Sequence, residues 1–194
     1  MNKKIIADFF DECAPTWDEN MLYSEAVINA ILDGAEITEG VNVLDVACGT
    51  GVLFPFYLER GVASITAVDI SPEMVKIAAG KHPGKNIRVI CADAEEGHFE
   101  GPFDRIVVYN AFPHFTNPER LIENLVSCLA EGGTLTVAHG MSKQSIDKRH
   151  RRAARKVSRE LPEAEELAEL FACHLQVTLC VSDGEMYQVS GRRV

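Results

Sequence analysis

Short apolar runs rich in β-branched residues alternate along this chain with segments of helical periodicity. Runs of the first kind cover residues 41–46, 64–69, 86–91, 103–109 and 129–139. A clear example of the second kind is Pro118–Leu129, where Leu121, Ile122, Leu125 and Leu129 would share one face. Strands that alternate with helices favour an α/β fold with a largely parallel sheet.

Capping residues mark where several of the helices should begin. Ser24 would cap a helix that ends near residue 34 and buries Val27, Ile28 and Ile31. Ser71-Pro72-Glu73 combines a capping serine, a proline at the first helical position and an acid in the first turn. Nearer the start, residues 3–10 have helical spacing, and Pro15 should break that helix.

The last third of the chain separates charge by sign before it ends in two strands. Eight of the nineteen basic residues lie between Lys143 and Arg159, and an acidic segment follows. Opposite charges on consecutive helices favour a hairpin whose surfaces pair, although a basic rim that attracts an anionic substrate or a phosphate is the alternative. Residues 175–181 and 185–190 flank an Asp-Gly turn, which predicts an antiparallel pair.

Composition limits the class of protein. The chain has 194 residues, of which 46% are apolar, and this predicts one globular domain. No apolar run reaches the roughly 18 residues of a membrane span, and acids come too early for a secretory signal. Six scattered cysteines without a C-x-x-C pair are typical of reduced thiols in the cytoplasm. A net charge of −10 argues against a nucleic-acid partner.

A glycine turn after the first strand is the strongest sign of a ligand site. Asp45 lies near the end of the strand, and Gly49-Thr50-Gly51 would bring the backbone close to a ligand at the carboxyl edge of the sheet. Phe54 stands where a dinucleotide fingerprint needs its third glycine, and an acid before the turn suits a cationic ligand better than a pyrophosphate.

Residues Leu44–Gly51 resemble the first motif of class I S-adenosylmethionine-dependent methyltransferases. Residues Phe10–Asn20 resemble the opening of the UbiE/menaquinone type of small-molecule methyltransferase. The resemblance covers residues 9–190 and implies a three-layer α/β/α sandwich, with a seven-stranded, mostly parallel sheet in the order 3-2-1-4-5-7-6 and a terminal antiparallel hairpin. It also implies one domain over residues 1–194, in which residues 1–34 are a helical lid and residues 140–172 a helical insertion.

The cofactor site implied by this resemblance draws on several strand ends. Asp69 ends the second strand, 18 residues past Gly51, where an acid can reach ribose hydroxyls. Asp93 and Ala94 match the family position that contacts adenine. The alternatives are that Asp69 only caps its helix and that Asp93 is a solvated loop acid. The predicted cofactor-binding residues are Asp45, Ala47, Cys48, Gly49, Gly51, Asp69, Ile70, Met74, Asp93, Ala94, Asn110 and Trp17.

Three histidines are the candidates on the acceptor side. Imidazole suits proton transfer near neutral pH, and His114 and His139 follow the fourth and fifth strands while His150 lies on the basic helix. We expect acid/base or acceptor contacts from these three, against the alternative of structural histidines. The sequence is compatible with a metal ion held by the three histidines, and Cys173-His174 could join such a site. The spacing of these residues does not support a metal site, however, so no metal is predicted.

The predicted function is methyl transfer from S-adenosylmethionine to a small molecule, such as a quinone-like or other apolar metabolite. One alternative is that the methyl acceptor is a nucleic acid or a protein, bound through residues 143–159. Another is a module that binds the cofactor or a nucleotide without catalysis. The sequence leaves the accepting atom and the oligomeric state open.

Overall fold

The computed structural model describes residues 1–83 and 85–194, without the side chains of residues 20, 152 and 153. Within these residues the strands form one seven-stranded sheet in the order β3-β2-β1-β4-β5-β7-β6, as predicted. Strands β1 to β5 run parallel, whereas β7 pairs antiparallel with both β5 and β6. The strands are β1 Asn42–Val46, β2 Ser64–Asp69, β3 Ile87–Cys91, β4 Phe103–Tyr109, β5 Leu129–His139, β6 Gln176–Ser182 and β7 Tyr187–Arg192.

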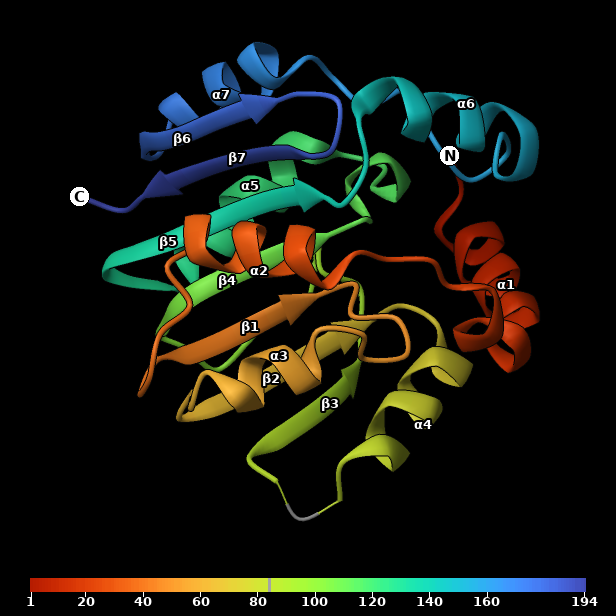
Figure 1. Ribbon diagram of the computed structural model, residues 1–194, viewed down its shortest axis with the longest axis horizontal. Coiled ribbons are helices and arrows are strands. Elements are labelled where there is room, and N and C mark those ends of the chain that lie inside the picture. The colour runs from red at the N-terminus through yellow and green to blue at the C-terminus, as the bar shows by residue number, and fades with distance from the viewer. Residues whose placement is uncertain (84) are drawn as a thin grey trace.

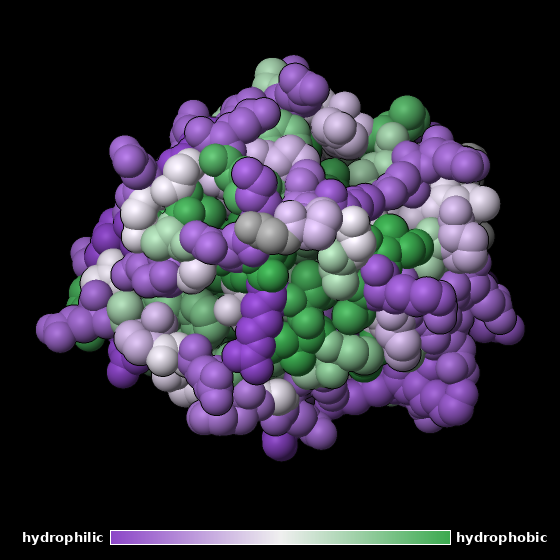
Figure 2. Space-filling model, turned by 90° about the horizontal axis from the view of Figure 1, so that it is seen from below, coloured by the Kyte–Doolittle hydropathy of each residue, from purple (hydrophilic) through white to green (hydrophobic). Residues whose placement is uncertain are grey.

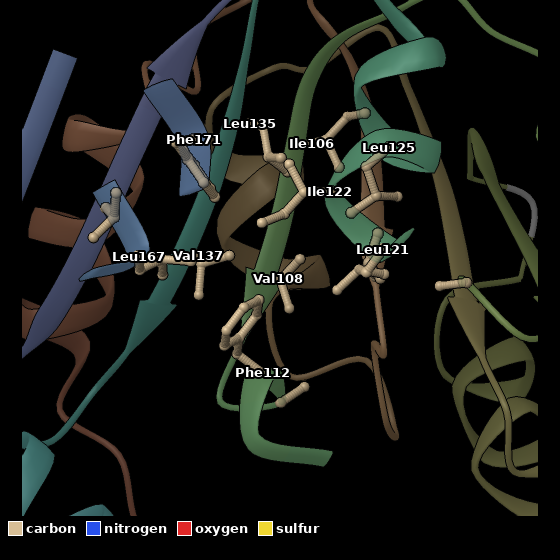
Figure 3. Packing of buried hydrophobic residues seen from close by; sticks show 14 of the residues in the cluster. Ile106, Val108, Phe112, Leu121, Ile122, Leu125, Leu135, Val137, Leu167 and Phe171 are labelled. Atoms are coloured by element: carbon tan, nitrogen blue, oxygen red, sulfur yellow. The ribbon is translucent and has the colours of Figure 1, made fainter. Parts of the chain in front are cut away.

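Helices cover both faces of the sheet and complete the three layers (Figure 1). Helices α2 (Glu25–Gly34), α3 (Phe54–Glu59) and α4 (Pro72–Lys81) contribute to the core on one face. Helices α5 (Pro118–Ser127) and α7 (Ala164–Ala172) cover the other. Figure 3 shows that second core, where residues of α5 and α7 point toward β4 and β5.

The predicted capping residues act as expected. Ser24 Oγ accepts from the Val27 amide at 3.4 Å, and Ser71 Oγ accepts from the Met74 amide at 3.1 Å. Asn117, which was not predicted as a cap, has the same role at the start of α5, because its Oδ1 accepts from the Arg120 amide at 3.0 Å. Helix α5 ends at Ser127, so Leu129 is buried as the first residue of β5 and not as the last inward residue of the helix. A side-chain acceptor at each of these starts satisfies an amide that the helix leaves free.

The remaining helices gather at one end of the sheet. Helix α1 (Lys3–Cys13), two short 3-10 turns at Ala14–Thr16 and Asp18–Asn20, and helix α6 (Lys143–Ala153) lie beyond the carboxyl ends of the parallel strands (Figure 1). A third 3-10 turn, Phe112–His114, follows β4. The basic helix predicted to reach Arg159 ends at Ala153, because the chain turns after it. This end of the molecule is therefore walled by segments far apart in the sequence.

Strand β3 is one of the two edge strands of the sheet, and its Ile87, Val89 and Ile90 are half-buried. Figure 2 views the molecule from below and shows hydrophobic surface framed by hydrophilic residues.

None of the helices in the described part of the chain is both long enough and apolar enough to cross a bilayer.

Candidate active site

A cavity of about 400 Å³ lies at the carboxyl ends of the parallel strands. Its lining comes from the loops after β1 to β5 and from α1, the first 3-10 turns and α6. Ligands of open α/β sheets bind at this edge, where the first loops diverge to either face. The cavity is therefore where a ligand of this fold should bind.

The loop after β1 adopts the conformations that its glycines allow. Gly49 and Gly51 have φ values of +54° and +84°. A Cβ on Gly51 would lie 2.5 Å from the ring of Phe54, so this position has no room for a side chain. Ala47 has a φ of +55°, which is unusual for a residue with a Cβ. Such strain occurs preferentially where a backbone is held for a ligand.

Asp69 joins this loop to the start of α4. Its Oδ2 accepts from the Gly49 amide at 2.8 Å, and its Oδ1 accepts from the Ser71 amide at 2.9 Å. Burial raises the pKa of the carboxyl, against the lowering effect of these backbone hydrogen bonds. A carboxylate has about four acceptor positions, so capacity remains for hydroxyl donors in the cavity. Ser71, not Asp69, caps α4 through its side chain.

Asp93 is held by a residue that the sequence analysis missed. Lys3 Nζ lies 2.5 Å from Asp93 Oδ2 and 3.0 Å from Glu95 Oε2. Although burial lowers the pKa of Lys3, its bonds to Asp93, Glu95 and Glu96 raise it overall. Helix α1 is thereby tied to the loop after β3. The only local signal was a lysine at the start of an amphipathic helix, which is commonplace.

Thirteen of the fifteen predicted site residues line this one cavity. The two that do not are Gly51, which shapes the loop, and Asp45. Asp45 is 2% exposed on β1, and its Oδ2 has no hydrogen-bond partner. Burial, and secondarily Asp69, raise its pKa well above the ordinary value. Because Asp45 lies inside the core beneath the loop, its predicted contact with a cofactor finds no support in the cavity lining.

The three predicted histidines converge at the acceptor side of the cavity and form what we call the histidine cluster: His114, His139 and His150. The ring centroids of His114 and His150 are 5.0 Å apart. His114 Nδ1 donates to the Val157 carbonyl at 2.9 Å, which leaves Nε2 as the unprotonated nitrogen of its neutral ring. His139 Nε2 and His150 Nδ1 are buried without any partner.

Electrostatics keep the histidine cluster neutral at neutral pH. Burial lowers the pKa of His114 to about 4 and that of His139 to about 3, and it also lowers the pKa of His150. Repulsion among the rings contributes in the same direction for His114 and His139.

A metal site is not indicated at the histidine cluster. Over residues 1–83 and 85–194, no group of three or more His, Cys, Asp or Glu side chains has the geometry to hold a metal ion. Cys173 and His174 are exposed and do not line the cavity, so they do not join the histidine cluster.

Two further lining residues were not predicted individually, although both lie in segments that the sequence singles out. Phe10 packs edge-on against both Trp17 and His114, with centroid distances of 5.8 and 5.0 Å. Arg149 lines the cavity from α6. Aromatic and basic residues at helical spacing are ordinary on surface helices, and only the fold brings these to the site.

A protein-family model described as a methyltransferase domain matches residues 43–133. Residues 43–133 therefore belong to this methyltransferase-domain family. The matched range begins within β1 and includes the glycine loop, Asp69 and Asp93, and it ends in β5.

Curated relatives and a solved structure are similar to the methyltransferase domain. The malonyl-[acyl-carrier protein] O-methyltransferase of Acetivibrio thermocellus is 30% identical over 70% of this chain and 49% of its own length. A demethylmenaquinone methyltransferase of Paenarthrobacter aurescens is 27% identical over 69% of this chain and 54% of its own. The chain thus spans about half the length of these relatives. The structure of the DhpI–SAH complex shares the fold, with a TM-score of 0.77, 19% identity, and coverage of 98% of this chain and 96% of that one.

Proposed function

We propose that this protein transfers a methyl group from S-adenosylmethionine to a small-molecule acceptor bound at the histidine cluster. The observation that supports it most strongly is the cavity itself, which joins the glycine loop, Asp69 and Asp93 on one side to the histidine cluster on the other. The range that matches the methyltransferase family model includes the glycine loop, Asp69 and Asp93, and this supports a cofactor role for that side of the cavity. The quinone-like acceptor suggested by the sequence is one member of the class of small, largely apolar molecules that this cavity could hold.

The residues fit the cofactor. Gly49 lines the cavity, and a Cβ there would already lie 3.8 Å from Trp17 Nε1, so the backbone and the indole enclose a narrow space. Asp69 keeps acceptor capacity for the ribose hydroxyls, Asp93 and Ala94 would face the adenine, and Asn110 lies near the acceptor side. When bound, S-adenosylmethionine supplies an activated methyl group on a sulfonium.

The role of the protein is then chiefly positional. Phe10, Trp17 and the helices α1 and α6 enclose the cavity and exclude water from the reacting groups. The side chains of the histidine cluster would orient the acceptor, since holding two reactants in line supplies much of the rate of a displacement. Neutral imidazoles there can accept a hydrogen bond at one nitrogen and donate one at the other.

Calorimetry with S-adenosylhomocysteine, the demethylated product, tests the cofactor side directly. We expect Asp69→Ala to weaken binding by roughly 1–3 kcal/mol, the usual cost of unpaired buried partners. Asp33→Ala, an exposed acid on α2, is the matched control and should leave binding unchanged. Binding of NADH in place of the product would overturn the proposal.

A further inference from the structure

Charge is divided between the two sides of the cavity. Its lining carboxylates, Asp69, Asp93 and Glu95, come from the end of β2 and from the loop after β3. Within the described residues the lining from Tyr109 to Ala154 contains no acid, but it contains the histidine cluster and Arg149. The acceptor side can therefore offer hydrogen-bond donors and positive charge, and no negative charge of its own.

Two buried nitrogens on this side lack partners. Buried polar atoms in native proteins are almost always hydrogen-bonded, and leaving one unpaired typically costs about 1–3 kcal/mol. His139 is 2% exposed, lines the cavity, and has an unpartnered Nε2, as His150 has an unpartnered Nδ1. Such atoms indicate a ligand whose polar group completes the bonding.

Among the described side chains of the basic segment, the expected charge pairing is confined to Lys143. Lys143 Nζ lies 3.0 Å from Asp147 and 3.2 Å from Glu163. In the part of the chain that the structure describes, no ion pair engages the other basic side chains of the segment, namely Lys148, Arg149, Arg151, Arg155, Lys156 and Arg159. These unpaired cations lie on a protein of net charge −10 and create a local positive field.

This positive segment adjoins the cavity at His150. A second hollow of about 130 Å³ is lined by His150, Arg151, Arg155 and Arg159, together with Asp147, Ser158 and Glu160. The carboxylate of Asp147 is already engaged by Lys143 and by the Leu161 amide, at 3.0 and 3.1 Å. The second hollow thus shares His150 with the cavity and places three arginine side chains beside the histidine cluster.

We propose that the acceptor is a small organic anion whose charged group binds between the histidine cluster and Arg149. This inference rests on the proposed function and names its substrate class. The attacking atom forms the new bond to the methyl carbon with its own electron pair, and the electron pair of the broken carbon–sulfur bond remains on sulfur. The sulfonium becomes a neutral thioether, the acceptor loses one negative charge, and no proton needs to be removed.

The weakness of the available bases agrees with an anionic nucleophile. Imidazoles whose pKa values lie near 3 and 4 are unprotonated at neutral pH, but they are poor bases for an alcohol or a phenol. A nucleophile that binds in its ionised form does not need a stronger base.

Matched probes that differ in charge test the inference on protein saturated with S-adenosylhomocysteine. Titration calorimetry would compare benzoate and phenyl phosphate with neutral benzamide and with benzylammonium. We expect at least one of the two anions to bind tenfold or more tightly than benzamide, and benzylammonium to bind weakest. Benzoate alone would indicate a carboxylate acceptor, and phenyl phosphate alone a phosphate ester.

Variants locate the charged group. Arg149→Gln and His150→Asn should each weaken anion binding at least fivefold, whereas Arg88→Gln, an exposed arginine on β3, should not change it. Equal binding of benzamide and both anions, or anion binding unaffected by the Arg149 and His150 changes, would overturn the inference. Binding of S-adenosylhomocysteine is measured in every variant. A loss of this binding would count against the proposed function. If it is retained, a change in anion binding reflects the acceptor side alone.

Discussion

The Cβ of an alanine substituted at Gly51 would have very different surroundings from the Cβ of an alanine substituted at Gly49. Both residues have positive φ, but only at Gly51 would the Cβ contact a buried ring, at 2.5 Å from Phe54. We expect Gly51→Ala to lower the free energy of unfolding by roughly 2–4 kcal/mol, from backbone strain and overpacking together. Gly49→Ala should cost about 1–2 kcal/mol from strain alone. Urea denaturation distinguishes them, and equal losses would contradict the clash.

The buried His139 should make the fold sensitive to acid. Burial, with smaller effects from His150 and His114, lowers its pKa to about 3, so below pH 6.5 the unfolded chain binds a proton that the folded protein does not. Stability therefore falls as the pH falls from 6.5 toward 3. Between pH 6.5 and pH 5 this one group should lower the free energy of unfolding by about 2 kcal/mol, at 1.36 kcal/mol per pH unit.

Replacing His139 by phenylalanine tests this. The change removes the titrating group without breaking a hydrogen bond at Nε2, and it keeps a ring beside Tyr187. We expect the difference in unfolding free energy between pH 7 and pH 5 to shrink by about 2 kcal/mol. His174→Phe, at an exposed position, is the control and should retain the wild-type slope. A slope unchanged in His139→Phe would refute the assignment.

At the scale of elements, the segment before α2 is tied to the loops that form the cofactor side. Asp11 Oδ1 accepts from Ser71 Oγ at 2.5 Å, and Asp18 Oδ1 accepts from Thr50 Oγ1 at 2.6 Å. Lys3 adds its pairs with Asp93 and Glu95. Helix α2, in contrast, packs Ile28, Ile31 and Leu32 fully into the sheet core. We therefore expect the mobile part of the proposed lid to end before residue 24.

Limited proteolysis measures that attachment. Lys3→Ala should speed cleavage within residues 1–23 several-fold and leave the urea midpoint nearly unchanged, because it releases α1 from the loop after β3. Lys4→Ala removes only an exposed pair with Asp8 and should behave as wild type. Saturating S-adenosylhomocysteine should slow cleavage in all three proteins. Identical cleavage of Lys3→Ala and Lys4→Ala would show that the Lys3 pairs do not hold the helix.

At the scale of the whole molecule, periodicity and caps were enough to place the strands and the starts of α2, α4 and α5. The strand order came from the family resemblance, because nothing in local sequence specifies which strands are neighbours. The strand-end acids and the histidines were predictable as site residues because carboxyl ends of parallel strands share one edge. Lys3 and Arg149 were not, since a lysine or arginine on an amphipathic helix has the same local pattern whether it faces solvent or a cavity. Asp45 shows the converse, where a motif position is buried under the loop it precedes.

The ion pair between Lys3 and Asp93 has a consequence for the rate at which the cofactor enters. An adenine amino group would compete with the lysine ammonium for one carboxylate, so arrival requires an exchange of partners. Both side chains are partly exposed, at 30% and 24%, and added salt weakens such pairs. We expect association to accelerate between 0.05 and 0.5 M salt, and this acceleration to vanish in Lys3→Ala. Trp17, the single tryptophan, lines the cavity and would report each encounter by stopped-flow fluorescence.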